Sequence, residues 1–404
     1  MRIIQVHNYY GSEAPSGENA VVDAERRLLE KAGHSVELFS RHSDSIRKLK
    51  YLGLVAGALA TPWNPFSARA LREHVKTFNP DVVHVHNTFP LISPSIFPAL
   101  RGHAPRVLTL HNYRLFCAAG IPLRHGKLCT LCIENHSVRP ALRFGCYRGS
   151  KLATWPLAAN IAFNRALGTW QKEVDAFIVF SEFQRDMVIN AGLPAELVHI
   201  KPNFYTGNPE ILPWSSRDGE IVFVGRLTRE KGTHTLIEAW RHWGANAPKL
   251  VVIGDGDERK DLENSAQGLP VTFLGQVASA VAIRAIANAR LMVLPSETFE
   301  GFPMVIGEAF AHATPVAVSD IGPLPALVQP VEAGIAFPPG DAAALFRTVS
   351  SLWSQPVKLA EMSQNARHAF ENAYTEEANL KRLIEIYDTA KQVADARIRK
   401  GARG

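Results

Sequence analysis

The segment Leu291-Met-Val-Leu-Pro-Ser-Glu-Thr-Phe-Glu300-Gly-Phe-Pro-Met-Val-Ile-Gly-Glu308-Ala is the most informative part of the sequence. Its first four residues are apolar and predict a short buried strand, after which a loop carries Glu300. Pro303 stands where the first residue of a helix is expected, because its fixed φ suits that position. Glu308 then lies inside the helix, and the helix N-terminus leaves unpaired N–H groups that suit a phosphate. Alternatively, Glu300 and Glu308 could both be solvated surface residues. The apolar neighbours of Glu308 disfavour this alternative: Val305, Ile306, Ala309 and Phe310.

A second loop, Val224-Gly225-Arg226-Leu-Thr-Arg-Glu-Lys231-Gly232, also follows an apolar run and precedes a helical pattern. Its glycines allow close backbone approach to a ligand, and Arg226 and Lys231 offer two cations for a diphosphate. It is not a Walker A loop, because the Gly-x-x-x-x-Gly-Lys-Ser/Thr pattern is absent. Taken alone, it would be an ordinary basic strand–helix loop.

Outward from these loops, the strand–helix pattern occurs twice along the chain. It predicts an α/β fold of two Rossmann-like, doubly wound parallel-sheet domains that face a central cleft. We expect domains over 1–203 and 204–374, and a charged helix and tail over 375–404 that packs back on the first domain. The expected strands are 2–7, 35–40, 81–86, 107–111, 176–181, 220–224, 250–253, 271–274, 291–294 and 315–318. The expected helices include 20–32, 183–191, 235–243 and 375–400.

The composition is typical of a globular enzyme: 404 residues, 46% hydrophobic and 20% charged. No apolar run approaches the ~20 residues that span a bilayer, and the N-terminal apolar stretch is too short for a signal peptide. These features predict a cytoplasmic protein. Residues 1–200 hold 23 Lys/Arg against 15 Asp/Glu, and residues 101–151 hold nine basic residues against Glu134 alone. This excess favours an anionic partner for the first half, although a solvated basic surface would look the same.

All four cysteines lie within 30 residues, spaced as Cys117, Cys129, Cys132 and Cys146. The pattern is close to that of a four-thiolate structural zinc site, and two disulfides or free thiols are the alternatives.

Two shorter patterns are less specific. His84 and His86 share one face of a strand and could bind a metal, but no third ligand is evident, so hydrogen-bonded histidine is favoured. Asp255-Gly256-Asp257 is formally Asp-x-Asp, but it falls in a strand–helix turn.

These motifs, taken together and in order, resemble retaining GT-B glycosyltransferases of glycosyltransferase family 4 over nearly the whole chain. The resemblance rests on the two loops above together with Pro80–Asn87, Thr109-Leu-His111-Asn, Ser181-Glu-Phe, Lys201-Pro-Asn203, Gly254-Asp-Gly256, Phe273-Leu-Gly275 and Ser319-Asp320. The segment from Cys117 to Cys132 resembles an insertion found in a subset of these enzymes.

The resemblance implies roles for individual residues. Arg226 and Lys231 would hold the diphosphate, Glu308 the ribose hydroxyls, and Glu300 hydroxyls of the donor sugar. His111 would face the transferred sugar and diphosphate. The remaining donor contacts would come from Gly17, Gly225, Gln276 and Val277. Three residues depart from the usual pattern: Ser16 before Gly17, Ala313 before Thr314, and Pro303.

The implied reaction is metal-independent, because cations and a helix N-terminus stabilise the departing nucleoside diphosphate. Front-face attack, rather than a glycosyl-enzyme on Glu300, is the expected route. The expected partners are a nucleotide-diphosphate sugar, a glycan or lipid-linked acceptor, and an anionic membrane surface reached by the segment 147–170. Two rival functions are a nucleotide-sugar epimerase with the same fold and a zinc-stapled nucleic-acid binder. The second-domain motifs disfavour both, and no nucleic acid is expected as a partner.

Overall fold

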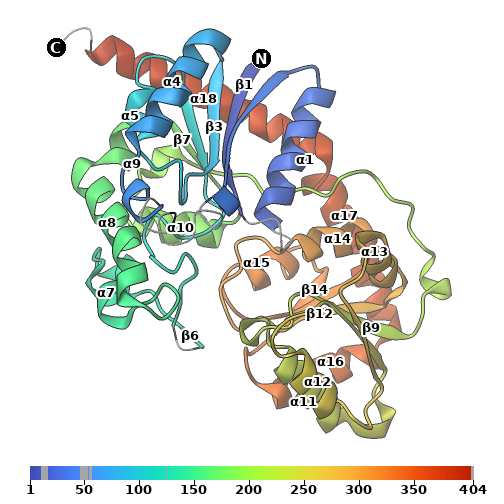
Figure 1. Cartoon of the computed structure of the whole chain (residues 1–404). Coiled ribbons are helices and arrows are strands. Elements are labelled where there is room, and N and C mark those ends of the chain that lie inside the picture. Colours follow the sequence, from blue (N-terminus) through green and yellow to red (C-terminus); the bar gives the residue numbers. More distant parts are fainter. Residues whose placement is uncertain (11–16, 46–52, 54–56, 125, 402–404) are drawn as a thin grey trace. The chain divides into compact units, whose positions relative to one another are not determined.

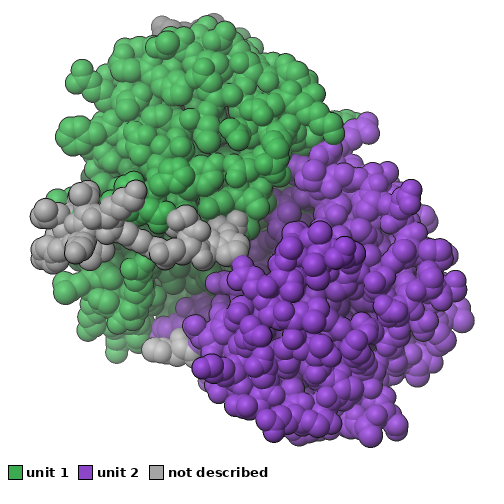
Figure 2. Space-filling view, turned by 45° about the vertical axis from the view of Figure 1, so that its right-hand side comes forward, with its two compact units in different colours: residues 1–122, 129–202, 379–404 green, residues 123–128, 203–378 purple. Residues whose placement is uncertain are grey.

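Strand–helix alternation builds two separate parallel sheets in the computed structural model, which describes residues 1–10, 17–45, 53, 57–124 and 126–401. The chain divides into two compact units, shown in different colours in Figure 2. The first unit comprises residues 1–122, 129–202 and 379–404, and the second comprises residues 123–128 and 203–378. Each unit is described by itself below.

The sheet of the first unit has six parallel strands in the order β2-β1-β3-β4-β7-β8. The central strands are buried on both faces, which is why they read as near-continuous apolar runs. Their bounds are β1 (Arg2–Tyr9), β2 (Ser35–His42), β3 (Val82–Asn87), β4 (Arg106–Thr109), β7 (Ala176–Val179) and β8 (Val198–Ile200).

Helices connect these strands. The longer ones are α1 (Gly17–Lys31), α4 (Pro65–Phe78), α8 (Lys151–Leu167) and α10 (Glu182–Asn190). Short pieces lie between them: α5 (Ile96–Ala99), α9 (Thr169–Lys172) and the 3-10 turn η1 (Ala195–Leu197). Local sequence sets the ends of α4, since the Asn64 side chain accepts from the first free N–H groups and Asn79 ends the helix in the left-handed region.

The long helix α18 (Glu376–Gly401) belongs to the first unit, as expected. Figure 1 shows it, in red, beside the strands of that unit. Its apolar side chains Leu383, Ile386, Tyr387 and Ala390 are buried in one core with residues of α1 and of the strands: Ile3, Leu29, Val82, Val107, Ala176 and Ile178. The residues around 380–390 therefore complete a core that begins at Ile3.

The cysteine-containing segment 113–150 forms several short regular elements. It contains the short hairpin β5 (Leu123–Arg124) and β6 (Lys127–Leu128), and the helices α6 (Leu131–Glu134) and α7 (Arg139–Phe144). Cys132, Ala141, Leu157 and Ile161 form a small core of their own. Local apolar burial thus supports these short elements.

The second unit repeats the arrangement, with six parallel strands in the order β11-β10-β9-β12-β13-β14. Their bounds are β9 (Glu220–Val224), β10 (Lys249–Ile253), β11 (Val271–Gly275), β12 (Leu291–Leu294), β13 (Val316–Ser319) and β14 (Gly334–Phe337). The fold class predicted from the sequence, two doubly wound parallel-sheet domains, is confirmed.

The helices of the second unit enclose a core around the fully buried Trp240, whose Nε1 donates to the Pro248 carbonyl at 2.8 Å. They are α11 (Thr233–Trp243), α12 (Arg259–Ser265), α13 (Ser279–Asn288), α14 (Met304–Ala311), α15 (Leu324–Val328), α16 (Ala342–Trp353) and α17 (Pro356–Ala373). The 3-10 turns are η2 (Trp214–Ser216), η3 (Arg229–Lys231) and η4 (Gly244–Asn246).

Pro303 corrects one detail of the prediction. It is the N-cap of α14 with ψ of 115°, not the first helical residue, because its extended ψ places it just outside the helix.

Candidate functional site

The strand order of the second unit places two loops side by side. The chain runs from β9 to β10 and β11 on one side, and then returns to β12 on the other side of β9. At such a switch point the loops after neighbouring strands diverge and leave a crevice at the carboxyl ends, where ligands of open α/β sheets bind. The loop after β9 carries Lys231, and the loop after β12 carries Glu300.

Lys231 and Glu300 meet at this point. The Lys231 Nζ donates to Glu300 Oε1 at 2.6 Å, and Ser296 Oγ donates to the same oxygen at 2.6 Å. Both charged side chains are largely buried. The pairing leaves Lys231 two further N–H groups, so the pair can bind an anionic group and a hydroxyl next to each other.

Gly232 lets the two loops approach each other. Its φ is +69°, and a Cβ at this position would lie 1.9 Å from the carbonyl oxygen of Pro295, which no side chain can tolerate. The backbone N–H of Glu297 also donates to the Glu230 carbonyl at 2.8 Å. The position of Lys231 relative to Glu300 is therefore fixed by backbone contacts.

Arg226 lies elsewhere on the same loop. Its side chain is 66% exposed, and its nearest carboxylate is that of Glu230, at 3.7 Å. Gly225 directly follows β9, and its N–H donates to the Ile253 carbonyl at 3.0 Å. The structure therefore places Arg226 in solvent and Lys231 against Glu300.

The remaining predicted donor residues follow other strands of this sheet. Glu308 lies in α14, and burial raises the pKa of its carboxyl. Its charge adds to the effect of burial in raising the pKa of Tyr205. Gln276 is exposed and Val277 half-buried after Gly275, the last residue of β11. β11 is two strands from β9, so these two residues lie farther along the sheet edge than Lys231.

Sequence reasoning missed a second carboxylate in the β12 loop. Glu297 Oε1 accepts from Thr235 Oγ1 at 2.7 Å and lies 3.0 Å from His234 Nε2. Burial alone would raise the pKa of Glu297, but His234 and Thr235 outweigh it and lower that pKa. These residues join the start of α11 to the β12 loop, and no pattern along the sequence signals the pairing.

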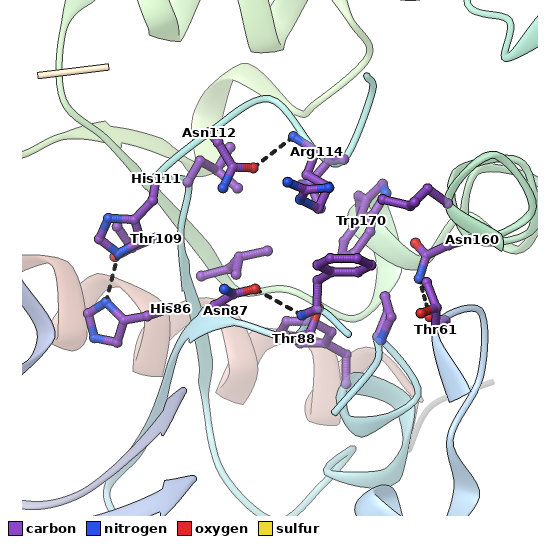
Figure 3. Close-up of a pocket in the computed structure, with 17 residues that line it drawn as sticks. Thr61, His86, Asn87, Thr88, Thr109, His111, Asn112, Arg114, Asn160 and Trp170 are labelled. Carbon is purple, nitrogen blue, oxygen red and sulfur yellow. Dashed lines mark hydrogen bonds between the residues drawn. The ribbon is translucent and has the colours of Figure 1, made fainter. Parts of the chain in front are cut away.

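In the first unit, the ends of β3 and β4 border a cavity that encloses about 590 Å³ of space, part of it open to solvent. Figure 3 shows polar side chains of Asn87, His111, Asn112, Arg114 and Asn160 around it. Apolar residues line the rest: Phe89, Pro94, Phe97, Leu108, Leu110, Leu115, Leu157 and Trp170. A ligand with both polar and apolar faces suits this lining.

The sequence predicted a strand over 107–111 that would include His111. In the structure β4 ends at Thr109, so His111 lies two residues beyond the strand. Its Nε2 is 3.1 Å from Nδ1 of His86, and burial holds the pKa of His111 well below the usual range. Burial also lowers the pKa of His86, to about 4. Both rings are therefore uncharged at neutral pH.

His84 and His86 have a third partner that the sequence did not reveal. Glu25 of α1 lies 3.0 Å from His84 Nδ1 and 3.3 Å from His86 Nε2, and these three residues form the only metal-compatible set among the described residues. Lys201 Nζ, however, lies 3.2 Å from Glu25 Oε2. An ammonium group already neutralises this carboxylate, so the group is an ion pair within a hydrogen-bonded network. The available signal was a carboxylate in the apolar stripe of α1, between Val21, Val22, Leu28 and Leu29.

The opening loop is described only from Gly17, the first residue of α1, and residues 11–16 of the predicted phosphate loop lie outside the described residues. No described atom lies within 4 Å of where a Gly17 Cβ would be. The adjacent Glu18 was not predicted as a site residue. Burial raises the pKa of Glu18 to about 8, although Arg114 and Asn87 oppose the shift. Carboxyl groups with such shifts concentrate at functional sites.

No disulfide bond joins the four cysteines, all of which lie in the described part of the chain. Burial raises the pKa of Cys117 and raises that of Cys132 to about 11, with smaller contributions from the other thiols of the group. Within the described part of the chain, however, no three of these sulfur atoms come within 4.8 Å of one another. The geometry therefore does not support zinc, which stays a prediction that metal analysis of the purified protein would test.

Comparisons with known proteins agree with the fold. Residues 206–369 match the family model "Glycosyl transferases group 1", and residues 15–205 match "Glycosyltransferase Family 4". A phosphatidyl-myo-inositol mannosyltransferase of Mycobacterium leprae (strain TN) is 24% identical, over 94% of this chain and 95% of that protein. A glycogen synthase of Mycobacterium tuberculosis (strain ATCC 25618 / H37Rv) is 25% identical, over 78% of this chain and 70% of that protein.

Among solved structures, Anabaena Alr3699/HepE in complex with UDP and glucose superimposes with a TM-score of 0.62 and 18% sequence identity. The match covers 96% of this chain and 100% of that one. Within the described residues, no helix is long and apolar enough to cross a membrane.

Proposed function

Because this chain is a glycosyltransferase with the GT-B fold, we propose that it transfers a sugar from a nucleotide-diphosphate donor to a hydroxyl of a glycan or lipid-linked acceptor. The contact between Lys231 and Glu300, at the switch point of the second sheet, is the observation that carries the proposal. It pairs a phosphate-binding cation with a carboxylate that can accept from sugar hydroxyls. The structural relative was solved in complex with UDP and glucose, which supports a nucleoside diphosphate as part of the donor.

The proposed donor site uses residues that follow the strands of the second unit. Lys231 and Arg226 hold the diphosphate, and Glu300 accepts from hydroxyls of the donor sugar. The half-buried Glu308 accepts from the ribose, and the backbone at Gly225 allows close approach. Gln276 and Val277 meet the base. For the first unit, the family resemblance implies that His111 faces the transferred sugar and that Gly17 allows backbone N–H groups to approach phosphate.

We propose that the reaction retains the anomeric configuration by front-face attack. The bond from the sugar C1 to the phosphate oxygen breaks, the acceptor oxygen bonds to C1, and the acceptor proton passes to the departing phosphate. Lys231, Arg226 and the N-terminus of α14 stabilise the developing negative charge, so the chemistry requires no metal ion. Proton NMR of the glycoside product would give the anomeric configuration and contradict this route if inversion were seen.

The donor assignment is tested by substitution in the β9 loop. Lys231→Ala or Arg226→Ala should lower turnover by about 10²–10³, as expected for the loss of a charge-stabilising donor. Arg241→Ala is the matched control, since this exposed cation lies in the last turn of α11. A thermal-shift screen against nucleotide sugars would identify the donor, because a ligand at 100 times its Kd adds about 2.7 kcal/mol of stability. Unchanged turnover in both loop variants would contradict the assignment.

We propose that residues 1–203 bind the acceptor, that 204–374 bind the donor, and that 375–404 complete the first domain. The cavity beside His111 supports the acceptor part, because its mixed polar and apolar lining suits a sugar attached to a lipid. The lipid headgroup in the name of the mycobacterial relative agrees with this chemistry.

We also propose that the first unit binds an anionic membrane surface from the cytoplasmic side. α8 buries one face and exposes apolar side chains on the other, including Leu152 at 88% and Trp155 at 58% exposure. Phe163 and Leu167 continue this exposed stripe. Each basic residue near an anionic surface adds about 1 kcal/mol, and apolar insertion adds a component that salt does not screen.

Liposome flotation tests this surface. Changing Arg139, Arg143 and Arg148, which are all exposed, to glutamate should weaken binding at low salt while leaving transfer to a short water-soluble acceptor intact. A charge-matched control changes three exposed basic residues of the second unit: Arg241, Lys249 and Lys358. Equal binding by both triple variants would contradict the proposal.

A further inference from the structure

A line of buried polar side chains crosses the first unit from α1 to the end of β4. Glu25 Oε1 lies 3.3 Å from His86 Nε2, and His86 Nδ1 lies 3.1 Å from His111 Nε2. Figure 3 shows the two rings joined by a hydrogen bond at the edge of the cavity. One carboxylate and one imidazole thus lead to His111, the residue proposed to face the sugar.

The carboxylate end of this line is firmly anchored. Glu25 lies 3.2 Å from Lys201 Nζ and accepts from Gln5 Nε2 at 3.2 Å. Burial alone would raise the pKa of Glu25, but Lys201 and His84 outweigh it and hold that pKa well below the ordinary value. Glu25 is therefore an ionised group that can only accept hydrogen bonds.

The ionised carboxylate of Glu25 determines which ring nitrogen of His86 carries a proton, and His86 then does the same for His111. Nε2 of His86 forms no hydrogen bond within the described part of the chain, but it lies 3.3 Å from the ionised Glu25 carboxylate, so a proton on Nε2 is favoured over a lone pair. His86 is uncharged, with a pKa of about 4, so its Nδ1 has a lone pair that accepts a hydrogen bond. The partner atom, Nε2 of His111, must then be the donor. In an uncharged ring, this leaves Nδ1 of His111 without a proton.

We propose that Glu25 and His86 are positioning residues that hold His111 in its Nε2–H form, with Nδ1 presented as a hydrogen-bond acceptor. Among the described residues, Nδ1 of His111 has no hydrogen-bond partner, and the ring borders the cavity. A bare nitrogen attracts a hydroxyl donor and repels a phosphate oxygen. The inference rests on the proposed function and narrows it, because His111 then accepts from a sugar hydroxyl and does not contact the diphosphate.

Nitrogen NMR of the ¹⁵N-histidine-labelled protein measures the tautomer directly and does not depend on catalysis. The His111 signals are identified by their loss in His111→Gln. We expect one protonated nitrogen, Nε2, and a bare Nδ1 at neutral pH in the wild-type protein. An Nδ1–H tautomer, or a charged ring, would overturn the proposal without any further variant.

Two variants then test whether His86 positions His111 or only fills space in the core. His86→Asn removes the hydrogen bond to His111. His84→Asn removes an equally buried ring that contacts Glu25, Tyr387, Thr109 and His86, and for which the described residues show no hydrogen bond to His111. We expect His86→Asn to mix the tautomers and lower kcat by about 10- to 100-fold, as is usual when a supporting partner is lost. The affinity for a free nucleoside diphosphate should not change in this variant. His84→Asn should leave the tautomer unchanged, and an equal change in both variants would indicate packing alone. If no transfer is detected although the tautomer is as stated, the proposed function fails. The proposal that Glu25 and His86 set the tautomer of His111 then still stands.

Discussion

At the scale of single residues, Glu18 makes stability depend on pH. Its pKa of about 8 exceeds the unfolded value of 4.5, so the folded chain binds an extra proton between these limits. The free energy of unfolding must therefore fall as pH rises from about 4.5 to 8. A pKa difference of one between the folded and unfolded chains corresponds to about 1.4 kcal/mol, so a contribution of a few kcal/mol is expected.

Urea unfolding of Glu18→Gln tests this expectation. The amide stays uncharged, so the variant should gain stability relative to the wild type as pH rises from 6 to 9, by about 1–3 kcal/mol. A difference between the two proteins that stays constant over this range would show that Glu18 titrates normally.

The variants Arg226→Ala and Lys231→Ala should differ in folding stability, although both substitutions should lower turnover. Arg226 is 66% exposed, so Arg226→Ala should change the free energy of unfolding by less than about 0.5 kcal/mol. Lys231→Ala leaves Glu300 with a charge that is largely buried, and should cost about 1–3 kcal/mol. Denaturant titrations of both variants measure this difference. Equal losses in the free energy of unfolding would show that the ion pair between Lys231 and Glu300 does not stabilise the fold.

At the scale of elements, most strands were predictable because both of their faces are buried. The strand 291–294 was located correctly, and 220–224 as well. The partners of buried charges were not predictable, since Glu25 and Lys201 are 176 positions apart in sequence and meet only through the sheet. Lys231 and Glu300 were both expected at the site, yet their direct contact depends on the order of β9 and β12, which apolar patterns alone do not specify.

Gly232 connects these two loops, and its substitution should disrupt them. Gly232→Ala introduces a Cβ that clashes with the Pro295 carbonyl. Gly268→Ala is a suitable control, because Gly268 also has a positive φ, of +78°, with no described atom within 4 Å of a Cβ. The control should cost about 1 kcal/mol for the left-handed backbone, and Gly232→Ala at least about 1–3 kcal/mol more. Thermal unfolding measures the difference, and calorimetry should also show loss of nucleotide binding in Gly232→Ala alone.

At the scale of the whole molecule, the first unit depends on α18. Leu383→Ala should cost about 2–5 kcal/mol, because Leu383 is fully buried against the sheet. Ile398→Ala, on the same helix but at a side chain that is 55% exposed, should cost less than about 0.5 kcal/mol. Hydrogen exchange should show lost protection in β1, β3 and β4 for Leu383→Ala only, whereas the strands of the second unit keep theirs. Uniform loss in both units would show that they unfold together.

The position of α18 also affects the order in which the protein can assemble as it is synthesised. A ribosome produces residues 1–202 first, but their core still lacks Leu383, Ile386 and Tyr387, which are translated about 180 codons later. The second unit, over residues 203–378, has its own core and emerges complete before them. Translation therefore favours a nascent chain in which the later unit matures first, while the apolar face of the earlier sheet waits for its last helix. A chaperone that shields this face during that interval would have the largest effect on yield.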